Sequence, residues 1–215
     1  MKALIFDFDE LLADSTSLHK EAFKRTFDEY QISAEMIPYE LSQNFIGKRL
    51  EDINKMIAEH FKMSVKPEVL TEKRNLAVLT LINSMQKLMP GARKVLEMGK
   101  NLGFKIALSS SGETRYLEKS LKFLKIEKYL DSIVTGDDVI KGKPDPECFV
   151  KAASLLDAEP EDSIVFEDAE NGVKAAKKAG MKVIAVINTR TPKQDLSKAD
   201  IILNSLEEVT EEMLR

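Results

Sequence analysis

The chain has 215 residues, of which 43% are hydrophobic and 32% are charged, and its formal net charge at pH 7 is −4. This composition suits one or two folded domains with a sizeable core, and the negative charge argues against nucleic acid or an anionic membrane as the main partner. The single cysteine, Cys148, excludes an internal disulfide. We find no signal-peptide pattern and no stretch approaching the roughly 18 apolar residues of a membrane span, so we expect a soluble, cytoplasmic protein. Nothing in the sequence demands more than a monomer, which is the expected state.

The chain begins with a short apolar strand that ends in two acids. The predicted strand is KALIF, residues 2–6, and Asp7 and Asp9 follow it with Phe8 between them. Because successive side chains of an extended chain alternate, both carboxylates project from the same side. Carboxylates this close repel one another, and a bound cation is the usual remedy.

The next seventy or so residues, 16–89, carry helical signals only. Apolar residues recur at helical spacing in LHKEAFKRTFDEY, in LEDINKMIAEHF and in VLTEKRNLAVLTLINSMQKL. We therefore predict helices over 18–30, 50–61 and 69–88, which together form a small helical bundle.

Strands and helices alternate in the rest of the chain. Such alternation implies right-handed crossovers and a parallel sheet, which the strand at 2–6 most simply joins. The predicted fold is thus a doubly wound α/β domain of residues 1–14 and 90–215, with a helical domain of residues 15–89 inserted after the first strand. The expected strands are 104–108, 132–136, 162–168, 182–187 and 199–203, and the expected helices are 113–124, 145–156 and 171–180.

Chemically active side chains follow four of the predicted strands, at the sheet edge where open parallel sheets bind their ligands. Mg²⁺ prefers oxygen ligands and commonly takes one or two carboxylates together with a phosphate oxygen. A hydroxyl and an ammonium can hold the remaining phosphoryl oxygens, so this edge is predicted to bind a phosphoryl group. The four groups are Asp7 with Asp9, the serines Ser109 to Ser111, Lys141 and Lys143 in KGKPDP, and Glu167 with Asp168.

These four motifs, in this order and each after a strand, resemble those of the haloacid dehalogenase (HAD) superfamily. The resemblance spans essentially the whole chain and is to the branch with a small helical cap inserted after the first motif. It implies a Rossmann-like core. The motifs are Asp7-Phe8-Asp9, a serine at Ser110 (with Ser109 as an alternative register), Lys143 in GKPDPE, and Glu167-Asp168 in FEDAENG.

The resemblance implies a role for each residue of the catalytic set. Asp7 would be the nucleophile that forms an aspartyl phosphate, and Asp9 the general acid and base. Ser110 and Lys143 would bind the transferring phosphoryl group, with Ser111 as a further substrate contact.

The same resemblance implies a magnesium site. Asp7 and Asp168 would supply carboxylate ligands, Asp9 its backbone carbonyl, and Glu167 either a ligand or support for the others. One departure stands at position 10, where the family usually has glycine and this chain has Glu10. That position begins the turn leading toward the helical insertion, where glycine offers backbone freedom.

Three residues of the helical insertion are candidate substrate contacts. His19 occupies a place where related phosphohexomutases have a histidine, although a surface histidine is an equal alternative. Lys48 and Arg49, in NFIGKRLED, could hold a second anionic group or form a solvated pair. The cap implied by the resemblance would close over the substrate and set specificity.

We therefore expect a magnesium-dependent phosphatase acting on a small phosphorylated metabolite such as a sugar phosphate, with neither nucleic acid nor membrane as partner. A β-phosphoglucomutase-like enzyme is the close rival, favoured by His19 and by the loop Gly47-Lys48-Arg49. It is disfavoured by Leu50, which stands where the mutase pattern has its cap arginine. A non-catalytic binding or regulatory protein is a third hypothesis. It is expected to have lost Asp7, Asp9 or Lys143, and all three are present.

Overall fold

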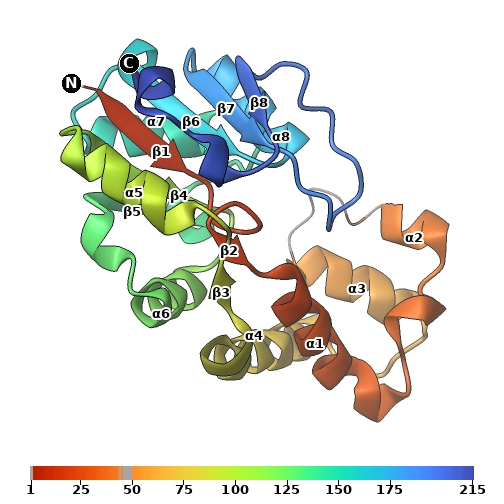
Figure 1. The fold of residues 1–215 in the computed structure, drawn as a ribbon. Coiled ribbons are helices and arrows are strands. Elements are labelled where there is room, and N and C mark those ends of the chain that lie inside the picture. The colour runs from red at the N-terminus through yellow and green to blue at the C-terminus, as the bar shows by residue number, and fades with distance from the viewer. Residues whose placement is uncertain (1, 44, 46–49) are drawn as a thin grey trace. The chain divides into compact units, whose positions relative to one another are not determined.

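The computed structural model of the chain describes residues 2–43, 45 and 50–215. The chain divides into two compact units, each described here by itself (Figure 1). The α/β unit consists of Met1–Thr16 and Gln86–Arg215, and the helical unit consists of Ser17–Met85.

A six-stranded, fully parallel sheet forms the centre of the α/β unit, which confirms the predicted Rossmann-like fold. Its strand order is β5-β4-β1-β6-β7-β8, so the N-terminal strand lies in the middle of the sheet. The chain winds from β1 outward through β4 to β5, then returns to the other side of β1 and continues outward. Such a reversal creates a crevice at the carboxyl ends of the central strands. The strands are β1 Ala3–Phe6, β4 Lys105–Ser109, β5 Ser132–Val134, β6 Ser163–Glu167, β7 Lys182–Val186 and β8 Ile201–Leu203.

Helices cover both faces of this sheet (Figure 1). Along β1 the side chains alternate between the faces, as a strand buried on both sides requires. Leu4 faces α5, where Gly99 allows close packing because a Cβ at Gly99 would lie 2.7 Å from Leu4 Cδ1. Ile5 instead joins the core on the other face, with Phe149 of α7 and Val173 of α8. The helices of this unit are α5 Ala92–Asn101, α6 Thr114–Leu124, α7 Glu147–Leu155 and α8 Glu170–Lys178.

Two details of the α/β unit differ from the sequence-based expectation. A small antiparallel pair joins β2, Ala13–Asp14, to β3, Lys87–Leu88. The helix expected to run to residue 88 therefore ends at Met85, because the backbone of the next residues is used in strand pairing. Helix α5, whose ten residues lie between the helical block and the second strand of the sheet, is absent from the sequence-based expectation.

The helical unit contains the expected bundle of helices and its own apolar core. Phe27, Ile57 and Leu70 from three of its helices are buried together. A side-chain hydrogen bond of 2.8 Å from Asn54 to Thr71 joins α3 to α4. Among the described residues, no helix is both long and apolar enough to cross a bilayer. The helices are α1 Thr16–Phe27, α2 Tyr39–Gln43, α3 Leu50–His60 and α4 Pro67–Met85, and a 3₁₀ turn at Asp28–Tyr30 ends the first predicted helix.

Candidate active site

The acidic residues and serines predicted to form the site lie at one edge of the sheet, where the central strands have their carboxyl ends. β1 pairs with β4 on one side and with β6 on the other, and the register aligns Phe6 with Phe166. The rings of these two residues stack with centroids 4.5 Å apart. Asp7, Ser109 and Glu167 each follow the aligned residue of their strand, so the three lie at the same level.

Three buried carboxylates form a cluster at this edge. Asp7, Glu167 and Asp168 each place one oxygen within 4.8 Å of the others. The Lys143 ammonium donates to Asp7 Oδ1 at 2.6 Å and to Glu167 Oε1 at 2.6 Å. When ionised, three carboxylates outweigh one ammonium by two negative charges. An all-oxygen donor set with that excess charge fits a divalent cation.

The ionisation of the acids reflects this crowding. Burial raises the pKa of Asp168 to about 7, and the neighbouring Glu167 carboxylate adds to the effect. Burial also raises the pKa of Asp7 well above its ordinary value, against the opposing effect of the Lys143 ammonium. Asp7 and Asp168 are thus neighbouring buried acids whose ionisation is unfavourable. A bound cation would stabilise the ionised form of both.

Lys143 lies in the loop between β5 and α7, with a side chain only 9% exposed. Its ammonium also donates to the Ser109 carbonyl at 3.2 Å and lies 4.8 Å from the centroid of the Phe149 ring. Burial alone would lower the pKa of Lys143, but the carboxylates of Asp7 and Glu167 raise it above its ordinary value. Lys143 is therefore charged and able to hold phosphoryl oxygens.

Glu167 is held by protein donors at both of its oxygens. Oε2 accepts the backbone N–H groups of Asp168 at 2.9 Å and Ala169 at 3.0 Å, while Oε1 accepts from Lys143. Gly172, on the first turns of α8, gives this carboxylate its space, because a Cβ there would lie 1.8 Å from Glu167 Oε1. The sequence did not indicate Gly172, because glycine is needed there by a tertiary contact with Glu167 and not by a turn.

The serines after β4 differ in environment. Ser109 and Ser110 are both buried, whereas Ser111 is exposed. Ser110 Oγ accepts the N–H of Gly112 at 3.0 Å, and the Ser110 N–H donates to the Val134 carbonyl at 3.0 Å. Because neighbouring side chains of extended backbone alternate, the hydroxyls of Ser109 and Ser110 point in different directions. Ser110 remains the predicted phosphoryl contact, with Ser111 beside it.

Asp9 is held by a tyrosine that the sequence did not indicate. The Tyr116 hydroxyl donates to Asp9 Oδ1 at 2.6 Å, and Gln86 Nε2 donates to the Tyr116 hydroxyl at 3.1 Å. The Tyr116 ring packs edge-on against Phe8, with centroids 5.8 Å apart. Burial and the Asp9 carboxylate raise the pKa of Tyr116 far above its ordinary value, so its hydroxyl is a permanent donor. Tyr116 is 107 positions from Asp9, and no local motif marks it.

Glu10 is buried and accepts several hydrogen bonds. Its Oε1 accepts the backbone N–H groups of Ser15 at 2.9 Å and Thr16 at 2.6 Å, and its Oε2 accepts from Asn188 Nδ2 at 3.0 Å. Burial alone would raise the pKa of Glu10, but these hydrogen bonds hold it below its ordinary value. Asn188 also donates to Asp168 Oδ2 at 3.2 Å. Asn188 directly follows the strand predicted at 182–187, so its strand-end position is the sequence signal that marks it.

The candidate substrate contacts of the helical unit stay predictions. His19 lies on α1 and is half-buried within that unit. Lys48 and Arg49 lie outside the described residues.

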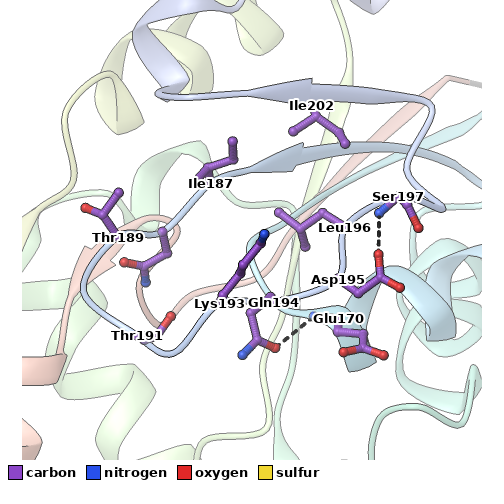
Figure 2. A pocket seen from close by; sticks show the side chains of 11 residues that line it. Glu170, Ile187, Thr189, Thr191, Lys193, Gln194, Asp195, Leu196, Ser197 and Ile202 are labelled. Atoms are coloured by element: carbon purple, nitrogen blue, oxygen red, sulfur yellow. Dashed lines mark hydrogen bonds between the residues drawn. The ribbon is translucent and has the colours of Figure 1, made fainter.

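A cavity of about 890 Å³ lies between the segment that follows β7 and Ile202 of β8. Figure 2 shows that the segment 187–197 surrounds it, with Glu170 and Ile202 completing the wall. Gln194 accepts the backbone N–H of Glu170 at 3.2 Å, which ties this segment to the start of α8 (Figure 2). Asn188 belongs both to this wall and to the carboxylate network described above.

The sequence profile described as haloacid dehalogenase-like hydrolase matches residues 4–186. The chain is 32% identical over 220 residues to the phosphorylated carbohydrates phosphatase of Thermotoga maritima, with 97% of this chain and 100% of that protein covered. It is also 32% identical over 223 residues to the β-phosphoglucomutase of Bacillus subtilis, with 100% of this chain and 94% of that protein covered.

A solved structure shares the fold. The crystal structure of β-phosphoglucomutase from Clostridium difficile aligns with a TM-score of 0.81, covering 100% of this chain and 95% of that one at 24% identity. At that identity the likeness supports the architecture and leaves the substrate open.

Proposed function

The chain belongs to the haloacid dehalogenase-like hydrolase family, and on that premise we propose that it is a magnesium-dependent phosphatase of small phosphorylated metabolites. The observation that carries this proposal is the contact of one buried ammonium, Lys143, with the carboxylates of Asp7 and Glu167, beside Asp168. A nucleophilic carboxylate, a cation for the phosphoryl oxygens and an acidic metal site are the parts that phosphoryl transfer through an acyl phosphate requires.

The proposed metal site uses the carboxylates of Asp7 and Asp168 and the backbone carbonyl of Asp9. When bound, Mg²⁺ would neutralise negative charge on the phosphoryl oxygens. Glu167 supports this site by orienting Lys143, because both of its oxygens already accept hydrogen bonds from the protein. The raised pKa values of Asp7 and Asp168 support this proposal, because a bound cation would stabilise the ionised forms of both carboxyl groups.

In the first step a carboxylate oxygen of Asp7 attacks phosphorus, and the bond from phosphorus to the metabolite oxygen breaks. The departing oxygen takes a proton from the Asp9 carboxyl group, and Asp7 becomes an aspartyl phosphate. In the second step water attacks phosphorus and gives its proton to Asp9, which releases inorganic phosphate and restores the Asp7 carboxylate. Lys143 and the Ser110 hydroxyl hold the phosphoryl oxygens during both steps.

We propose a sugar phosphate as the substrate class, because the Thermotoga maritima relative is a phosphatase of phosphorylated carbohydrates and aligns along its whole length. The helical unit is proposed to act as the cap that sets this specificity, with His19, Lys48 and Arg49 as its candidate contacts. The cytoplasmic location and the monomeric state expected from the sequence remain part of the proposal.

A second candidate function is a phosphohexomutase reaction, in which the aspartyl phosphate is returned to a sugar hydroxyl and not to water. It is favoured by the 32% identity to β-phosphoglucomutase over the whole of this chain. Leu50 stands against it, because the mutase pattern expected from the sequence has an arginine at that position.

The test is a screen of metabolite phosphates with Mg²⁺, in which phosphate release and isomer formation are read from the same reactions. The phosphatase proposal expects inorganic phosphate from at least one sugar phosphate, no turnover in EDTA and none by Asp7→Asn. Glucose 6-phosphate formed from β-glucose 1-phosphate with a trace of the 1,6-bisphosphate would instead establish the mutase. A broad panel without turnover of either kind would contradict both.

A further inference from the structure

Position 10 combines a costly backbone conformation with a well-satisfied side chain. Glu10 has a φ of 63°, in the left-handed region that glycine adopts freely and other residues adopt at a cost. The side chain of Glu10 is nevertheless buried, with only 7% of the residue exposed. A non-glycine residue in this backbone conformation needs compensating interactions elsewhere. For Glu10 these are the hydrogen bonds of its carboxylate.

One oxygen of Glu10 holds the segment that leads into the helical unit. Oε1 accepts the N–H groups of Ser15 and Thr16, at 2.9 Å and 2.6 Å. Thr16 is the first residue of α1, so the carboxylate satisfies backbone donors that have no partner within a helix. Its negative charge is also favourable at a helix N-terminus.

The other oxygen of Glu10 reaches the proposed metal site through Asn188. The Asn188 amide nitrogen donates to Glu10 Oε2 at 3.0 Å and to Asp168 Oδ2 at 3.2 Å, using its two hydrogens on two carboxylates. The Asn188 amide group is oriented by its oxygen, Oδ1, which accepts the backbone N–H of Arg190 at 2.8 Å. Arg190 in turn forms a 2.6 Å ion pair with Asp14, a second tie between the same two segments of chain.

We infer that Glu10 is a positioning residue, which orients the metal-ligating carboxylate of Asp168 through Asn188 while it anchors the start of α1. The metal role of Asp168 rests on the proposed function. Glycine at position 10, which has no side chain, could supply neither tie. The side chains of Glu10 and Asn188 thus couple the segment entering the helical unit to the proposed metal site.

The sharpest test is Glu10→Gln, because the two side chains have nearly the same size. The amide oxygen of the introduced glutamine can still accept from the backbone of Ser15 and Thr16, but its amide nitrogen would face the Asn188 amide nitrogen, donor against donor. We expect Mg²⁺ affinity, measured by calorimetry without substrate, to fall about 10-fold, as is usual when a group that orients a metal ligand is lost. Asn188→Ala should lower the Mg²⁺ affinity by a similar factor. The double variant of Glu10→Gln and Asn188→Ala should lower it little further, because both changes break the same bridge.

Two further variants complete the experiment. Glu10→Gly should weaken Mg²⁺ binding and also speed amide hydrogen exchange at Thr16, which Glu10→Gln should leave protected. Glu21→Gln, in an exposed pair with Arg25, is the matched control and should bind Mg²⁺ as the wild type does.

Wild-type Mg²⁺ affinity in Glu10→Gln, or losses that add fully in the double variant, would overturn the inference. A wild-type protein that binds no Mg²⁺ would overturn both the inference and the proposed function. A protein that binds Mg²⁺ and releases no phosphate would overturn the proposed function alone, and the affinities of the variants would still decide the role of Glu10.

Discussion

The ammonium of Lys143 lies 2.6 Å from a carboxylate oxygen of Asp7, although 136 positions separate the two residues along the chain. Both side chains are nearly buried, with exposed fractions of 9% and 13%. The pairing is made by topology: β1 lies in the middle of the sheet, and the loop after β5 returns to its carboxyl end. This one contact joins the proposed nucleophile to the proposed phosphoryl-binding cation.

Lys143→Met should greatly lower activity and destabilise the metal-free protein. The variant keeps the length and packing of the side chain but leaves buried carboxylates without their counter-charge, a change that costs about 3 kcal/mol in buried pairs. Loss of the cation that holds the transferring group should lower kcat on the order of 10³-fold. Steady-state phosphate release and thermal unfolding followed by circular dichroism measure the two effects.

Lys141→Met is the matched control, because Lys141 is exposed two positions away in the same loop. It should retain the activity and the melting temperature of the wild type. If Lys143→Met and Lys141→Met behaved alike, Lys143 would have no part in the reaction.

The stability of the metal-free protein should fall as pH rises from 5 to 8. Burial raises the pKa of Asp168 to about 7, above the ordinary value of 3.8, so across this range the folded state binds more protons than the unfolded state. Stability then decreases with pH, and the raised pKa of Asp7 acts in the same direction. Saturating Mg²⁺ should therefore raise the melting temperature more at pH 8 than at pH 5.

Asp168→Asn isolates the part of this effect that comes from one residue. In EDTA the variant should be more stable than the wild type at pH 8, and the difference should shrink toward pH 5, where Asp168 is protonated. Because the chain has no tryptophan, circular dichroism is the appropriate probe. A difference in melting temperature that is constant with pH would contradict the assigned ionisation.

Tyr116→Phe should slow the transfer of phosphate from substrates with poor leaving groups. The variant removes the 2.6 Å hydrogen bond to Asp9 and leaves the Gln86 amide without its acceptor. We expect about a 10-fold fall in the rate of aspartyl-phosphate formation from a sugar phosphate, because the proton donor is no longer held in place. Formation from 4-nitrophenyl phosphate, whose leaving group needs little protonation, should change much less.

Rapid-quench kinetics with both substrates measures this first step directly. A merely structural role for Tyr116 would lower both rates by the same factor, and that outcome would exclude it as a positioning residue for Asp9.

Gly172→Ala should impair activity and lower the melting temperature even though alanine favours helices by about 1 kcal/mol over glycine. The added Cβ would lie 1.8 Å from Glu167 Oε1 and would displace that carboxylate from Lys143. We expect at least a roughly 10-fold loss of kcat. Gly142→Ala is the control, since a Cβ at Gly142 meets nothing within 4 Å. Equal behaviour of the two variants would show that Glu167 tolerates displacement.

The candidate site residues that follow regular strands were predictable from the sequence, because ligands of a parallel sheet bind at the carboxyl ends of its strands. Asp7, Glu167 and Asp168 follow apolar runs that read as buried strands, and parallel strands deliver their carboxyl ends to one edge. Lys143 was predicted from its motif, and the structure places its ammonium in the acid cluster.

Residues that act by contact across the fold were not predictable in this way. Tyr116 reaches Asp9 from a helix, Asn188 links Glu10 to the acid cluster, and Gly172 makes room for a carboxylate. Tyr116 and Gly172 have ordinary local sequence settings, so nothing in the neighbouring residues reveals their roles. Asn188 stands at a predicted strand end, but the two carboxylates that it links are known only from the tertiary structure. The effect of Glu10, open at the level of sequence, became interpretable once its φ and its hydrogen bonds were known.

The sequence by itself determined the α/β alternation, the helical insertion and the candidate site residues at the strand ends, because hydrophobic periodicity and strand-end position are local properties of a chain. The tertiary structure alone decided which polar groups hold those side chains in place. Hydrogen bonds between residues a hundred or more positions apart depend on distances of a few tenths of an ångström, and such distances are set by packing, which no local pattern encodes.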